Sequence, residues 1–240
     1  MMTMPLSLVD HAKGELEELI LKGRLKPGQR IGEQEVAGII GISRPPLREA
    51  LKLLEAEGLV VRIPRKGAFV VELTEKDIWE IYTLKSALFG AATELAMASP
   101  DGSWLDDLGA CAEQMEVVAR SDHPTVETYQ DVHAAFHDII LEHAANDRLT
   151  RLASTLHRPV QIISLQSLAD IDHLRSSCEY HRAIYEAMRA DDVRQAVRLT
   201  HDHVMFALDR LLKMRSTDDP AFVGEHMNHR GQVLRAFSVD

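Results

Sequence analysis

Hydrophobic residues recur three and four positions apart along most of the chain, which is the spacing of amphipathic helices. Only residues 59–71 alternate differently, in two short β-branched runs separated by Pro64-Arg65-Lys66-Gly67, and this pattern predicts a β-hairpin. The pattern therefore predicts a mainly α protein. We expect helices at 7–23, 33–40, 43–57, 75–98, 103–120, 125–145, 148–168, 171–190 and 193–214.

The predicted helix between Ser43 and Gly58 carries a buried stripe of Leu47, Ala50, Leu51 and Leu54. Ser43 is expected to be its N-cap, with the side-chain oxygen accepting a hydrogen bond from a free backbone N–H of the first turn. Gly58 is expected to end it.

Two arginines mark the leading end of this helix. Arg44 and Arg48 are four residues apart and share one exposed edge. An arginine fork can bind a phosphate or a guanine edge through two hydrogen bonds, so this helix can lie in a DNA major groove. The alternative is a surface helix with two solvated arginines.

The neighbouring segments favour the first interpretation. The helix predicted at 33–40 is joined to the next by Gly41, which makes a helix-turn-helix. The hairpin would form the wing of a winged helix. In it, Arg65 and Lys66 can follow the DNA backbone, and Gly67 allows the tip to approach a groove closely.

Charge is distributed unevenly along the chain. The net charge is −10, but residues 24–66 contain nine Lys and Arg against five Asp and Glu, whereas residues 73–240 contain sixteen against twenty-seven. Only the basic N-terminal part is therefore expected to meet phosphate.

The cysteine content and the absence of long apolar segments indicate the compartment in which the protein is expected. The two cysteines, Cys111 and Cys178, are far apart and form no C-x-x-C motif, which is typical of a reducing compartment. No signal sequence or membrane span is evident, so we expect a cytoplasmic protein without a membrane partner.

The N-terminal residues resemble the DNA-binding domain of the GntR family of bacterial transcription regulators. The matching elements are Pro27-Gly28, Ser43-Arg44-x-Pro46-Leu47-Arg48-Glu49-Ala50-Leu51, Glu55-x-x-Gly58-Leu59-Val60 and Gly67-x-Phe69-Val70. The resemblance implies DNA contacts at Ser43, Arg44, Arg48 and Gly67, with Gln34 contributing. Pro45 stands where many members have threonine, so the base preference there is open.

Residues after 74 resemble the FCD effector domain of the FadR subfamily, in the shorter VanR-like branch. The elements are Asp77-x-x-Glu80-x-Tyr82, Phe136-His137, Ala145-Asn146, Glu179-x-His181-x-x-Ile184 and the segment 192–203. We expect a DNA-binding domain at 7–72, an antiparallel six-helix effector domain at 75–215, and a tail at 216–240 with no assigned role.

Four of the twelve histidines fall on inward-facing helical positions: His133, His137, His181 and His203. Converging imidazoles inside a bundle can bind a borderline divalent metal. The alternative is a set of buried neutral histidines bonded to carbonyls or water. Periodicity does not separate His203 from His201.

The FCD resemblance implies that these four residues are the ligands, and selects His203. Metal-binding members have an aspartate at the position of His133, so this site would lack one negative charge. We expect zinc, with nickel as the alternative, since an all-nitrogen set suits both. Asp131 is expected to face elsewhere.

Lys85 falls on the apolar face of its helix. The resemblance places an arginine here that holds an effector carboxylate, and lysine keeps the charge without the two-pronged contact. The alternative is a lysine that extends to the edge of the bundle.

The expected protein is a homodimeric transcription regulator that binds palindromic operator DNA and is controlled by a small carboxylate bound beside a metal. A regulator for which the metal itself is the signal is the alternative. A metal-dependent enzyme is disfavoured, because no general base or nucleophile accompanies the histidines.

Overall fold

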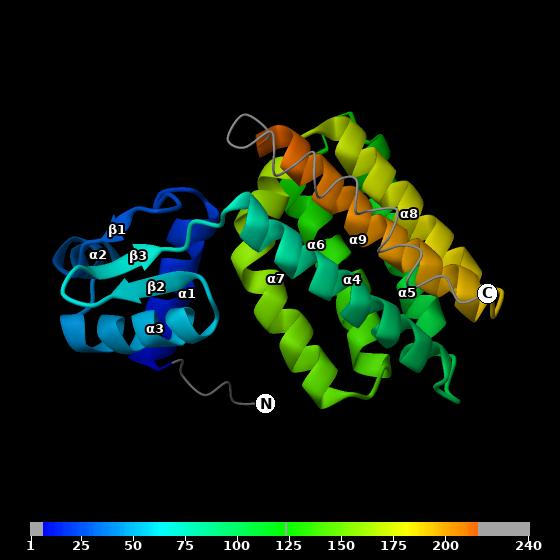
Figure 1. Cartoon of the computed structure of the whole chain (residues 1–240), viewed down its shortest axis with the longest axis horizontal. Helices are drawn as coiled ribbons and strands as arrows, with labels where there is room; N and C mark the ends of the chain where they lie inside the picture. The colour runs from blue at the N-terminus through cyan, green and yellow to red at the C-terminus, as the bar shows by residue number, and fades with distance from the viewer. Residues whose placement is uncertain (1–6, 123, 216–240) are drawn as a thin grey trace. The chain divides into compact units, whose positions relative to one another are not determined.

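A computed structural model describes residues 7–122 and 124–215. Within these residues the chain forms nine helices and one small sheet (Figure 1). In chain order the elements are α1 (Leu8–Leu21), β1 (Arg30–Ile31), α2 (Glu33–Ile40), α3 (Arg44–Ala56), β2 (Val60–Ile63), β3 (Gly67–Val70), α4 (Glu75–Met97), α5 (Trp104–Arg120), α6 (Val126–His143), α7 (Asp147–Leu168), α8 (Ile171–Arg189) and α9 (Val193–Arg215). The mainly α fold predicted above is confirmed.

Contacts divide the chain into two compact units, with the boundary between Leu73 and Thr74. The first unit also includes His157–Ile162 from the middle of α7. Each unit has its own hydrophobic core. The expected tail at 216–240 lies outside the described residues.

The first unit is a winged helix-turn-helix. Its antiparallel sheet has the order β1-β3-β2, and the predicted hairpin is the pair β2–β3, in which Ile63 lies opposite Gly67. The short extended segment Arg30–Ile31 adds the third strand by pairing with β3. Helices α1, α2 and α3 and this sheet share one core, to which α3 contributes the fully buried side chains of Leu47 and Leu54.

The start of α3 differs from expectation. Ser43 has the extended backbone of an N-cap, but its side chain makes no capping hydrogen bond. The residues whose N–H groups an N-cap oxygen would accept are Pro45 and Pro46, which have no N–H to donate. The expected position of the N-cap is therefore confirmed, but the expected hydrogen bond is wrong, and the side chain of Ser43 is exposed.

The second unit is a helical bundle whose interior is enclosed by five helices. Helix α4 packs against α9, α9 against α8, α8 against α5, α5 against α6, and α6 against α4 again. Helix α4 starts at a capping box, in which Thr74 and Asp77 exchange side-chain and backbone hydrogen bonds. The ring places side chains from α4, α6, α8 and α9 around one interior. None of the described helices is long and apolar enough to cross a membrane.

Candidate nucleic-acid interface and metal centre

The residues predicted to contact DNA lie at the start of α3, on α2 and at the tip of the β2–β3 hairpin. Every one of them is exposed: Gln34, Ser43, Arg44, Pro45, Arg48, Arg65, Lys66 and Gly67. Helix α3 buries its leucine stripe against the core, so its opposite edge presents Arg44 and Arg48 to solvent.

The hairpin tip is a tight turn. The Lys66 N–H donates to the Ile63 carbonyl over 3.0 Å. Arg65 has φ 65° and Gly67 has φ 107°, a conformation that glycine adopts without strain. The turn leaves the side chains of Arg65 and Lys66 exposed beside each other, as contact with a phosphate backbone requires.

Sequence reasoning did not identify Glu33 as part of this surface. The Arg48 Nε donates to Glu33 Oε2 over 2.7 Å, and an Arg44 terminal nitrogen lies 3.6 Å from the same oxygen. The hydrogen bond from Arg48 lowers the pKa of Glu33, and the charges of Arg48 and Arg44 add to this effect. Fifteen residues separate Glu33 from Arg48, so no local spacing indicates the pair.

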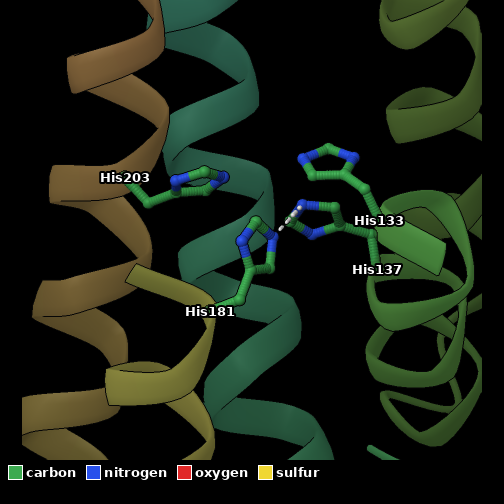
Figure 2. Close-up of side chains that lie close together, drawn as sticks. All are labelled: His133, His137, His181 and His203. Atoms are coloured by element: carbon green, nitrogen blue, oxygen red, sulfur yellow. Dashed lines mark hydrogen bonds between the residues drawn. The ribbon is translucent and has the colours of Figure 1, made fainter. Parts of the chain in front are cut away.

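The four predicted metal ligands converge inside the bundle. Figure 2 shows His133 and His137 from α6 facing His181 from α8 and His203 from α9. One nitrogen from each ring can be chosen so that all four lie within 4.8 Å of one another. Three helices therefore supply a single cluster of imidazoles.

Backbone hydrogen bonding orients one of these rings. His181 is fully buried, and its Nδ1 lies 2.6 Å from the Ser177 carbonyl oxygen. Because a carbonyl only accepts, this Nδ1 carries the proton and Nε2 is left with its lone pair. That Nε2 lies 3.2 Å from His137 Nε2 (Figure 2). A backbone carbonyl that accepts from the other ring nitrogen commonly fixes the tautomer of a metal-bound histidine.

Burial disfavours the charged form of two of the four imidazoles, His181 and His203. It lowers the pKa of His181 to about 4. It also holds the pKa of His203 well below its ordinary value, with further lowering by His181, His137, His173 and Lys85. Neutral imidazoles are the form that binds metal.

The cluster fits a divalent ion. Two nitrogens bound at about 2.1 Å to one ion are about 3.4 Å apart in a tetrahedral site and about 4.2 Å apart on opposite sides of the ion, so the widest pair, within 4.8 Å here, would close by about 0.6–1.4 Å on metal binding. His203 Nδ1 is buried and has no hydrogen-bond partner among the described residues. Such a donor set suits zinc or nickel.

Two neighbouring residues are excluded from the cluster by geometry. His201 instead lies against α4, with its Nδ1 2.7 Å from Ser86 Oγ. Asp131 is exposed, as expected. The structure thereby separates His203 from His201, which periodicity did not.

Lys85 is buried, with 9% of its surface exposed, and does not extend to the edge of the bundle. Its Nζ lies 5.1 Å from the ring centroid of Tyr82 and 5.8 Å from that of Phe89. Burial lowers its pKa to about 8. Its charge also lowers the pKa of His203, so Lys85 acts electrostatically on the histidine cluster.

Comparison with known proteins identifies both units. Residues 8–70 match the bacterial regulatory proteins of the gntR family, and residues 80–206 match the FCD domain. The chain belongs to the GntR family. It is 32% identical over 185 residues to the probable D-xylose utilization operon transcriptional repressor of Paenarthrobacter nicotinovorans, covering 77% of this chain and 80% of that protein.

Two further comparisons agree with this assignment. An uncharacterized HTH-type transcriptional regulator of Bacillus subtilis, YdhC, is 28% identical over 177 residues, covering 73% of this chain and 78% of that protein. The solved structure of Escherichia coli McbR/YncC has the same fold, with a TM-score of 0.73 at 21% identity over 88% of this chain and 99% of that chain. This GntR protein is a transcriptional regulator with an FCD effector domain, and not an enzyme.

Proposed function

We propose that this GntR regulator is a homodimer that binds a palindromic operator and responds to a small carboxylate bound beside a divalent metal. The observation that carries the proposal is the convergence of four imidazoles from three helices, two of them buried and two partly buried. The charge of Lys85 acts on His203 of this cluster. The effector would shift the relative populations of DNA-binding and released forms.

The start of α3 and the hairpin tip would contact the DNA. Arg44 and Arg48 would read base edges in the major groove, while Arg65, Lys66 and Ser43 would contact phosphates. Gln34, Pro45 and Gly67 would border the same surface. One short recognition helix reads few base pairs, and two symmetric half-sites need a dimer.

His133, His137, His181 and His203 would hold the metal. Zinc is proposed, with nickel as the alternative. Four protein ligands complete a tetrahedral zinc site, so an effector oxygen or water would bind as a fifth ligand of an expanded coordination shell. The ion would supply positive charge there.

The charges favour an anionic effector. The four imidazoles are neutral ligands and add no negative charge to the ion, and Lys85 adds a further positive charge in its protonated form. A buried excess of positive charge is costly unless an anion compensates it. A carboxylate beside the ion and Lys85 would do so.

Metal analysis tests the centre. Protein purified without a polyhistidine tag should carry about one zinc or nickel ion per chain. The His137→Ala,His181→Ala variant should carry almost none. Equal trace metal in both proteins would remove the centre from the proposal.

Operator release tests the effector. Small carboxylic acids that raise the melting temperature of the metal-loaded protein should release it from DNA, and Lys85→Met should weaken this release at least tenfold. Lys76→Met is the control, because Lys76 is exposed on the same helix and pairs with Glu80. An unchanged response in Lys85→Met would remove Lys85 from the site. Release by metal alone would identify the metal as the signal.

A further inference from the structure

We propose that Glu33 is a positioning residue for DNA recognition: it holds the guanidinium plane of Arg48 for base contact and disfavours binding to DNA of the wrong sequence. The inference rests on the proposed role of Arg48 in base reading. It adds to the DNA-contact surface a residue whose charge is opposite to that of its neighbours.

The contact uses one edge of the arginine. Arg48 donates to Glu33 through Nε, over 2.7 Å. A guanidinium has five N–H donors in one plane, so the two terminal nitrogens keep theirs. These terminal nitrogens can together contact guanine O6 and N7. A bond at Nε fixes the plane in which they lie.

Glu33 is itself held in place by a rigid element. It is the first residue of α2, a helix anchored in the core by the buried side chains of Val36 and Ala37. Only 27% of the Glu33 side chain is exposed, against 51% for Arg48. The carboxylate is therefore the better-fixed partner, and a well-fixed partner can impose its geometry on a flexible one.

The space around the pair is a hollow between α3 and the hairpin. It has a volume of about 370 Å³, and its lining includes Glu33, Arg48, Arg62 and Arg65. Glu33 is the single acid in a lining that otherwise carries three arginines. A DNA phosphate near this hollow is attracted by the arginines and repelled by Glu33.

These two effects favour the correct sequence. When a guanine accepts from the terminal nitrogens, the Nε bond to Glu33 stays intact and both interactions are made. On other sequences Arg48 has only phosphates to bind, and the adjacent carboxylate opposes that contact. Specificity can come from such an element that penalises the wrong partner.

The experiment compares two variants on two duplexes. The duplexes are a 40-base-pair sequence that the wild-type protein enriches from a random library and a scrambled duplex of equal composition. Glu33→Ala should lower the ratio of specific to non-specific affinity about tenfold, as expected for disturbing one bidentate base contact. Glu35→Ala is the matched control: Glu35 is exposed on the same helix and has no ion pair among the described residues.

Loss of charge alone would act on both variants alike, strengthening binding to any DNA without changing the ratio. A ratio that is unchanged in Glu33→Ala, or lowered equally in Glu35→Ala, would overturn the inference. Glu33→Asp provides a second variant if Glu33→Ala does not fold. It keeps the charge but shortens the side chain, and it should also lower the ratio.

A double-mutant cycle separates this inference from the proposed DNA contact. Arg48→Ala alone should lower the ratio, and adding Glu33→Ala should lower it little further, since Glu33 accepts a hydrogen bond from Arg48 over 2.7 Å and lies farther, 3.6 Å, from Arg44. If Arg48→Ala leaves the ratio unchanged, the role of Arg48 is wrong and the inference fails with it. If Arg48→Ala lowers the ratio but Glu33→Ala does not, only the role of Glu33 is wrong.

Discussion

At the scale of single residues, His181 combines a fixed orientation with a depressed basicity. The Ser177 carbonyl accepts its Nδ1 proton over 2.6 Å, and the Phe136 ring packs edge-on with centroids 4.8 Å apart. The hydrogen bond by itself favours the protonated ring, but burial outweighs it and lowers the pKa to about 4. A neutral, pre-oriented imidazole results, and this is the form in which histidine binds a metal.

This depressed pKa predicts acid sensitivity of the metal-free protein. The unfolded chain takes up a proton at His181 below its ordinary pKa of 6.5, whereas the folded chain does so only near pH 4. Stability should therefore be fully present above pH 6.5 and fall by about 3 kcal/mol towards pH 4.

Urea unfolding of chelator-treated protein at pH 4.5, 5.5, 6.5 and 7.5 measures this dependence. His181→Ala should lower stability at every pH but flatten its dependence on pH. His11→Ala, which changes an exposed histidine of α1, should leave the dependence unchanged. A wild-type pH dependence retained in His181→Ala would contradict the assignment.

At the scale of elements, the pairing of α4 with α9 depends on a small residue. His201 of α9 bonds to Ser86 of α4, and its ring passes over Gly90 one turn further along. A Cβ at Gly90 would lie 2.5 Å from His201 Nε2. The contact between α4 and α9 continues at Thr93 and Thr200, whose hydroxyl oxygens are 3.1 Å apart. Close approach at Gly90 thus fixes where the two helices meet.

Replacing this glycine should therefore be destabilising. Gly90→Ala should cost about 1–3 kcal/mol, because the ring must move and its bond to Ser86 is strained. Gly14→Ala is the control within α1, where an added Cβ meets nothing within 4 Å. That change should instead stabilise by about 0.5–1 kcal/mol, the ordinary helix preference for alanine. Thermal unfolding measures the stability of the two variants. Stabilisation by both substitutions would show that the His201 ring moves aside at little cost in free energy.

At the scale of the whole molecule, a bound ion would tie α6, α8 and α9 together, because each supplies at least one ligand. An ion that binds only the folded chain stabilises it by mass action. Chain folding, metal occupancy and effector response would then be linked.

Metal removal should show this linkage. A chelator should lower the melting temperature of the wild-type protein, by an amount corresponding to about 3 kcal/mol if free metal had been present at 100 times its dissociation constant. It should leave the melting temperature of His137→Ala,His181→Ala unmoved. DNA affinity should change less than the response to the effector, since the ligands lie in the FCD domain. A chelator without effect on wild-type stability would mark the four histidines as core residues.

The sequence by itself determined the helices, the hairpin and the faces that are buried. The stripe of Leu47, Leu51 and Leu54 and the inward position of His137 follow from periodicity, because burial of a helix face imposes a repeat of 3.6 residues on the local chain. Family resemblance added the association of four histidines into one set. Helical periodicity and family resemblance can both be recognised in the amino-acid sequence without a structure.

The tertiary structure decided what depends on partners far apart in the sequence. It paired Glu33 with Arg48, turned His201 towards Ser86 while His203 joined the cluster, and buried Lys85 beside aromatic rings. Helical spacing cannot determine these, since it states which face a residue occupies but not which side chain lies opposite. The absent capping hydrogen bond of Ser43 could have been predicted from the sequence. Pro45 and Pro46 have no N–H to donate, and the general preference for serine at an N-cap does not take this into account.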